Sequence, residues 1–138
     1  MFQLFASIIS YDIWFYISHV LLHSKSFAKY HHTHHLDENP NWITTYKSHF
    51  IEGPFQGVGM FFPYSMYTYT LRDTLLVITF LNIRGMMRHD PRWSWLIGNH
   101  HILHHKYSEY NFGEYWMDTL CGTRYPKKSE YKYGLIYV

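Results

Sequence analysis

Histidines are concentrated in two short segments of this chain. Residues 31–35 read His-His-Thr-His-His, and residues 100–105 read His-His-Ile-Leu-His-His. Histidine is a poor helix former and only moderately common in protein cores, so packing alone does not account for such clusters. Neutral imidazole is a frequent metal ligand in proteins. The two segments therefore predict a metal site built mainly from nitrogen ligands.

The spacing within each segment decides which imidazoles can share a metal. On a helix, residues three or four apart lie on one face, whereas adjacent residues diverge by about 100°. An H-x-x-H-H segment can therefore direct the two imidazoles of its adjacent pair to two different metals. With an H-x-x-x-H pair and one isolated histidine, the chain offers more nitrogen ligands than one ion takes and enough for two. The predicted metal ligands are His19, His23, His31, His34, His35, His89, His101, His104 and His105.

Several neighbouring residues are candidates for an alternative ligand or for groups that orient the ligands. His100 is also four residues before His104, so it could replace His101 as a ligand, but His101 reproduces the spacing of the first segment. Metal-bound histidines usually donate their second ring N–H to a carboxylate or carbonyl group. The candidates for orienting roles are Asp12, His49, His100 and Asp118, and also Glu52 and Asp90. A structural histidine is the alternative for His49, and a helix cap or surface charge is the preferred interpretation of Glu52 and Asp90.

Three apolar stretches predict the elements that position these histidines. Residues 1–23, 54–69 and 74–87 are rich in aliphatic and aromatic side chains. About twenty helical residues cross roughly 30 Å of hydrocarbon. The shorter stretches could form a hairpin that packs against protein. We therefore predict an all-α fold with about three membrane segments and a helical cap that carries a dimetal site.

The predicted topology gathers the histidine segments in one place. Three crossings put the end of the first stretch, the start of the second and the end of the third on one side of the membrane. That side carries every predicted ligand and more of the basic residues, so we expect it to be cytoplasmic. Asp12, Tyr16, His19 and His23 share one face of the first helix, as expected for ionisable groups that face a protein interior.

Composition limits the other classes of protein. Aromatic residues make up 21% of the 138 residues and charged residues only 16%, which suits one membrane domain spanning 1–138. The net charge of +2 is not concentrated on one face, which argues against a nucleic-acid partner. The single Cys121 excludes an intrachain disulfide and a multi-cysteine zinc site. The first twenty residues lack a basic n-region and a cleavage site, so we do not expect a signal peptide.

These motifs resemble the fatty acid hydroxylase and sterol desaturase superfamily of integral-membrane di-iron oxygenases. The first helix is similar to the family's D-x-x-F-Y-x-x-H-x-x-x-H pattern, and both histidine segments resemble its H-x-x-H-H boxes. The resemblance extends over residues 11–123. Further matching elements are Pro40-Asn41, His49 to Glu52, His89-Asp90, Asn111-Phe112-Gly113 and Trp116 to Thr123.

The resemblance implies a chemistry that the spacing alone does not. It implies two iron ions, dioxygen as co-substrate, and hydroxylation or desaturation of a sterol or fatty-acyl lipid. It also implies an intracellular membrane such as the endoplasmic reticulum. No haem-binding or flavin-binding segment is evident, so we expect electrons from a separate protein of the cytochrome-b or ferredoxin type. Lys127 and Lys128 could dock an acidic donor, and contact with lipid headgroups is the alternative.

The chain also departs from the family pattern. Its N-terminal region is short, Phe50 replaces a proline, and Gly85 occupies a position that some relatives use for a tenth ligand. Met117 and Cys121 replace aromatic residues. Two alternatives therefore stay open. A zinc metalloprotein is one, although neither box contains the carboxylate base of H-E-x-x-H enzymes. A degenerate regulatory member is the other, although all nine usual ligand positions are filled.

Overall fold

The computed structural model describes residues 2–37 and 39–136, and within these ranges every regular element is helical. The two long helices are α1 (Phe2–Leu22) and α4 (Leu71–Arg88). The predicted first helix is confirmed over residues 2–22, while Met1 lies outside the described residues. Shorter helices complete the fold: α2 (Ala28–His31), η1 (His34–Leu36), η2 (Thr44–Tyr46), α3 (Glu52–Gly57), η3 (Val58–Ser65), η4 (Pro91–Trp93), α5 (Ser94–Ile97), α6 (His100–Lys106), α7 (Tyr115–Cys121) and η5 (Lys128–Glu130).

Local sequence signals determine where α4 begins and ends. The Thr70 hydroxyl accepts a hydrogen bond from the Asp73 amide at 3.2 Å, and the Asp73 carboxylate accepts one from the Thr70 amide at 3.0 Å. This reciprocal capping satisfies two amides that the first turn of a helix leaves unpaired. At the other end, Pro91 disfavours a helical conformation at Asp90, and the helix ends at Arg88. His89 is thereby placed at the C-terminal end of α4.

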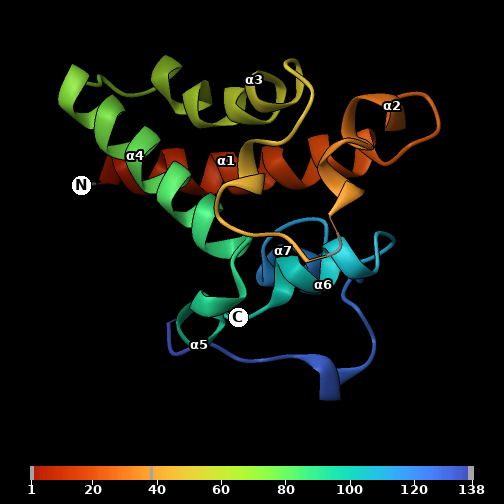
Figure 1. Ribbon diagram of the computed structural model, residues 1–138. Coiled ribbons are helices and arrows are strands. Elements are labelled where there is room, and N and C mark those ends of the chain that lie inside the picture. Colours follow the sequence, from red (N-terminus) through yellow and green to blue (C-terminus); the bar gives the residue numbers. More distant parts are fainter. Residues whose placement is uncertain (1, 38, 137–138) are drawn as a thin grey trace.

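The α3–η3 segment packs along one side of α1. Trp14 donates its indole N–H to the Phe55 carbonyl at 2.7 Å, and the Ser10 hydroxyl donates to the Gly59 carbonyl at 2.8 Å. A Cβ atom at Gly59 would lie 2.4 Å from the Trp14 Cβ, so only glycine permits this approach. In Figure 1, α6 and α7 lie on the other side of α1, close to the end that leads into α2.

The prediction of three membrane segments is not confirmed. Among the described residues, only α1 is long and apolar enough to cross a membrane. Residues 54–69 form a short α-helix followed by a 3-10 helix, because Pro63 lacks an amide donor and Gly59 must pack flat against α1. Residues 74–87 do lie within one helix, but α4 also includes Arg72, Asp73, Arg84 and Arg88, which lower its mean hydropathy.

Exposed apolar side chains repeat every four residues along α1. Phe5, Ile9, Ile13, Ile17 and Leu21 are all substantially exposed. The opposite face carries Asp12 and His19, which are buried. A helix in water exposes its polar side chains and buries its apolar ones, whereas α1 does the reverse. This arrangement is expected of a helix with lipid on one side and a polar protein interior on the other.

Candidate metal centre

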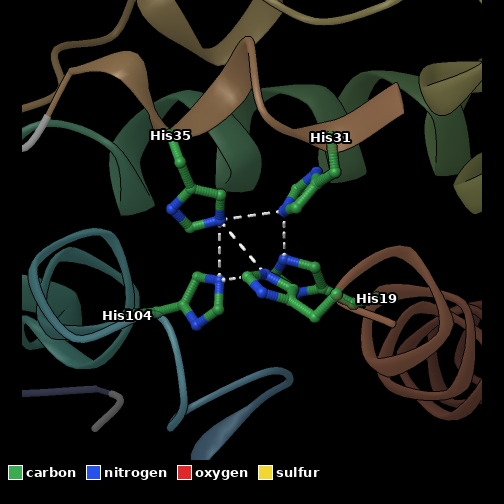
Figure 2. A group of neighbouring side chains, drawn as sticks. His19, His31, His35 and His104 are labelled. Carbon is green, nitrogen blue, oxygen red and sulfur yellow. Dashed lines mark hydrogen bonds between the residues drawn. The ribbon is translucent and has the colours of Figure 1, made fainter. Parts of the chain in front are cut away.

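Five histidines from three segments of the chain lie close together. His19 and His23 come from α1 and its C-terminal extension, His31 and His35 from the α2–η1 segment, and His104 from α6. Figure 2 shows the ring nitrogens of His19, His31, His35 and His104 pointing toward one another. The Nε2 atoms of His19 and His35 each lie 2.9 Å from that of His31.

The nitrogen separations match those of ligands around one metal ion. The Nε2 atoms of His104 and His35 are 3.1 Å apart, and those of His104 and His23 are also 3.1 Å apart. Two nitrogens at right angles around an ion, each about 2.1 Å from it, would be about 3.0 Å apart. We refer to His19, His23, His31, His35 and His104 as the five-histidine pocket.

Hydrogen bonds at Nδ1 orient three rings of this pocket. His31 Nδ1 lies 2.9 Å from Glu52 Oε1, and His104 Nδ1 lies 2.6 Å from the Tyr110 carbonyl oxygen. His19 Nδ1 is hydrogen-bonded to the Phe112 carbonyl. Because a carbonyl oxygen can only accept, the ring must donate Nδ1–H there, and the lone pair of Nε2 then points into the pocket. His19 and His104 are thereby held in the tautomer that a metal requires, and the Glu52 carboxylate, when ionised, holds His31 in the same tautomer.

A second group of four histidines adjoins the first. His34, His89, His101 and His105 are all buried, and we refer to them as the four-histidine pocket. The Nε2 atom of His89 lies 3.0 Å from that of His34 and 3.1 Å from that of His101. His89 donates its Nδ1–H to the Gly85 carbonyl at 2.7 Å.

His105 provides the clearest test of whether this pocket fits a metal. Its side chain is 3% exposed, and neither ring nitrogen has a hydrogen-bond partner among the described residues. Leaving a buried polar group unpaired costs about 1–3 kcal/mol. A metal ion bound at one nitrogen would compensate for that cost, so the donor set of the pocket fits a metal.

Each adjacent histidine pair divides between the two pockets. His34 and His105 belong to the four-histidine pocket, whereas their neighbours His35 and His104 belong to the five-histidine pocket. The rings of His35 and His105, which face each other from the two groups, have centroids 4.9 Å apart. The structure thus brings all nine predicted ligands together in the two-group arrangement that the spacing predicts.

Burial keeps these imidazoles neutral. Desolvation is the largest cause, and it lowers the pKa of His31 and His34 to about 4 and that of His89 to about 3. Desolvation and the neighbouring imidazoles lower the pKa of His23 to about 3 and that of His35 to about 2. A neutral imidazole has a free lone pair, so these side chains are able to bind metal at neutral pH.

Asp118 organises the loop that supports the five-histidine pocket. Its carboxylate is fully buried and accepts hydrogen bonds from the amides of Phe112 and Gly113 at 2.9 and 2.8 Å. It also accepts from the Thr123 hydroxyl at 2.6 Å and lies 2.9 Å from His100 Nε2. The Phe112 carbonyl that orients His19 belongs to the same loop. Asp118 and His100 therefore lie outside both pockets and act through the backbone.

The structure places two orienting candidates away from the histidines and brings a third, Glu52, into contact with one of them. Asp12 pairs with Arg84, and the ring of His49 packs against Tyr30 with centroids 5.1 Å apart. Glu52, in contrast, is 3% exposed and contacts His31 directly, so the preferred interpretation as a cap or surface charge is wrong. Its distance from His31 in the sequence gave no local signal of this contact.

A buried ion-pair cluster that the sequence patterns did not predict lies beside the four-histidine pocket. Arg88 donates to Glu114 Oε1 at 2.7 Å, and its second terminal nitrogen lies 3.5 Å from His101 Nδ1. Arg84 joins Asp12 to the same glutamate, at 3.6 Å from Glu114 Oε1. Cations inside an apolar helix usually mark function or a buried partner, and this signal could have identified both arginines.

Two hollows reach the histidines from different sides. A cavity of about 340 Å³ between α1, α3 and α4 is lined by three members of the four-histidine pocket and by His19 of the five-histidine pocket, together with apolar residues such as Phe15 and Leu81. A smaller hollow of about 190 Å³ is lined by three members of the five-histidine pocket together with His32 and Ser108. The first is bordered by a largely apolar surface, whereas His32 and Ser108 are exposed.

Comparison with known proteins identifies the same pattern. The family model described as fatty acid hydroxylase matches residues 4–123. No curated protein matches the chain, and no solved structure matches it.

Proposed function

Because the chain belongs to the fatty acid hydroxylase family, we propose that it is a membrane-bound oxidoreductase that hydroxylates or desaturates a lipid at a di-iron site. One observation carries the proposal. Two adjoining pockets of neutral histidines lie beside an apolar cavity, and the cavity lies between helices that present apolar side chains outward. A water-insoluble substrate could reach the histidines along this route.

Two iron ions, when bound, would supply dioxygen activation and removal of hydrogen from an unactivated C–H bond. Hydroxylation consumes one dioxygen, two electrons and two protons, and it yields an alcohol and one water. Desaturation consumes the same reactants, and it yields a double bond and two waters.

The side chains of this chain would bind and orient the reactants. The five-histidine pocket would hold one ion and the four-histidine pocket the other. Glu52 and the carbonyls of Phe112, Tyr110 and Gly85 would keep the ligand rings in place through their Nδ1–H groups. Phe15 and Leu81 would exclude water from the side of the site that faces the cavity.

We propose that electrons come from a separate acidic protein of the cytochrome-b or ferredoxin type. Exposed cations favour such a partner: Lys127 is 69% exposed, and Lys128 lies beside it in the C-terminal segment. Lys127 and Lys106 both lie near Glu130, so the cationic surface extends to the end of the second histidine segment. We further propose that the histidines lie on the cytoplasmic side of an intracellular membrane.

Metal analysis combined with lipid mass spectrometry tests the function. We expect two irons per chain, together with a host lipid that gains one oxygen or loses two hydrogens. A control that carries both His104→Ala and His105→Ala, one substitution in each pocket, should lack the modified lipid. Zinc as the only metal that supports a reaction would favour the zinc metalloprotein instead. Iron-loaded protein that modifies no lipid would favour a regulatory role.

A further inference from the structure

Two buried polar atoms in the large cavity have no partner among the described residues. They are the Thr45 hydroxyl oxygen and Glu52 Oε2, and both residues line the cavity. Glu52 is 3% exposed, so its second carboxyl oxygen lies away from solvent. Unpaired buried oxygens are costly, and a cavity that contains them fits a ligand that can form hydrogen bonds.

Both residues have contacts that place them close to the histidines. A Cβ atom at Gly85 would lie 3.7 Å from the Thr45 methyl carbon, and the Gly85 carbonyl accepts the Nδ1–H of His89. Glu52 uses its other carboxyl oxygen to contact His31. Thr45 is therefore close to the four-histidine pocket, and Glu52 is close to the five-histidine pocket.

The cavity is more apolar away from the histidines. Ile78 and Met60 line it there, with Gly57 on α3. Ile78 precedes His89 by eleven residues of α4, which corresponds to about 16 Å along the helix axis. Ser10 and Trp14 are the α1 residues that contact Gly59, and both are likewise more than one helical turn from His19. Gln56 and Asn82 also line the cavity, and the Asn82 amide donates to the Ile78 carbonyl at 2.8 Å, so Ile78 and Met60 supply the apolar contacts for the hydrocarbon part of a ligand.

We propose that Thr45 and Glu52 bind a hydroxyl or amide group of the lipid substrate, so that the C–H bond that reacts lies within a few bonds of that group. The hydrocarbon part of the substrate then runs along α4 toward Ile78 and Met60. Thr45 and Glu52 determine specificity in this arrangement. The proposal rests on the proposed function and makes it more specific, because it excludes reaction far along an alkyl chain.

Binding of matched lipids to a Thr45→Val variant tests the polar end. Valine keeps the shape of threonine and removes only the hydroxyl. Metal-loaded protein in lipid nanodiscs would be titrated with hexadecanol and hexadecane, and with cholesterol and cholestane. Loss of one hydrogen bond is worth about 1 kcal/mol, so we expect about five-fold weaker binding of the alcohol that the protein prefers. Binding of the corresponding hydrocarbon should not change.

Two further variants separate the loss of the Thr45 hydrogen bond from a general disturbance of the cavity. Thr119→Val removes an exposed hydroxyl on α7 that donates to the Tyr115 carbonyl, and it should leave binding of both lipids unchanged. A Cβ at Gly57 would meet no atom within 4 Å, so Gly57→Leu can extend into the cavity. This variant should weaken binding of the alcohol and the hydrocarbon alike.

The outcomes distinguish the inference from the function on which it rests. Equal losses for alcohol and hydrocarbon in Thr45→Val, or no loss for either alcohol, would overturn the inference even if the protein oxidises a lipid. Product analysis adds a second criterion, because oxidation far from the polar group would also overturn it. Iron-loaded protein that binds the alcohols selectively and oxidises no lipid would support the binding site and contradict the proposed function.

Discussion

The two histidine pockets have similar side chains but differ in how firmly these are held. The five-histidine pocket has one more histidine, and Glu52, Phe112 and Tyr110 fix three of its rings through Nδ1. In the four-histidine pocket, His89 has a comparable partner in the Gly85 carbonyl, whereas neither ring nitrogen of His105 has one among the described residues.

The pockets also differ in what surrounds them. His23 and His35 of the five-histidine pocket are partly exposed beside a small hollow, while all four members of the other pocket are buried. Three members of the four-histidine pocket line the larger cavity, whereas His19 is the one member of the five-histidine pocket that does so. This difference suggests a division of roles: one metal would be held rigidly near solvent, and the other would keep a coordination position available toward the substrate.

Removal of one ligand should therefore affect the two pockets unequally. We expect His89→Ala to reduce the metal content from two ions to one and to abolish lipid oxidation, because three ligands remain. His23→Ala leaves four ligands in its pocket and should retain both ions with weaker affinity. Metal analysis of the purified variants measures the difference. Equal metal loss in the two variants would show that the pockets are not distinguished by their ligand number.

Removal of an orienting carboxylate should have the next largest effect. Partners of metal-bound histidines typically contribute 10–100-fold to metal affinity. We expect a loss of that size in the five-histidine pocket for Glu52→Ala, measured by competition with a chelator. His49→Ala is a suitable control, because His49 packs against Tyr30 instead of a ligand. A similar loss in both variants would argue that Glu52 acts through general stability.

Acidification should destabilise the metal-free protein through the buried histidines. The pKa values of His34 and His89 are about 4 and about 3, below the ordinary value of about 6.5. Unfolded histidine therefore binds a proton at a pH where the folded side chain does not. Stability is fully present above pH 6.5 and is lost as pH falls toward 4, by up to about 1.4 kcal/mol per pH unit for each such histidine.

Thermal melting of the metal-free protein in detergent between pH 7 and pH 5 measures this loss. The double variant with His34→Asn and His89→Asn should show a smaller decrease in melting temperature over the same range. An unchanged decrease would assign the acid sensitivity to other groups.

The smallest expected effect concerns the electron donor. Reversal of charge at Lys127 and Lys128 should reduce the rate of electron transfer from an acidic donor several-fold at low salt, and added salt should diminish the difference. Arg72→Glu changes an exposed cation at the N-terminal end of α4, which is the end away from His89. This variant should leave the rate of electron transfer unchanged. Unchanged electron transfer in the lysine variant would exclude docking at this surface.

The parts of the site that could be predicted depend on local spacing. The grouping of His34 with His105, and of His35 with His104, follows from the 100° between adjacent helical residues. The α4 boundary follows from Thr70, Asp73 and Pro91, which act within a few residues of their own positions.

The parts that could not be predicted depend on contacts between distant segments. Asp12 and Arg84 are 72 residues apart, and Glu52 meets a histidine 21 residues before it. The second apolar stretch was expected to form one long segment. It is divided instead, because Gly59 must pack flat against Trp14, and composition does not indicate that tertiary requirement.

The division of neighbouring histidines between the pockets has a consequence for how metal is acquired. A single peptide bond connects a histidine of one pocket to a histidine of the other at both His34-His35 and His104-His105. Binding of the first ion would immobilise these backbone segments and so remove part of the ordering cost for the second. We expect the two ions to bind cooperatively, so that chains with a single ion are scarce at partial loading.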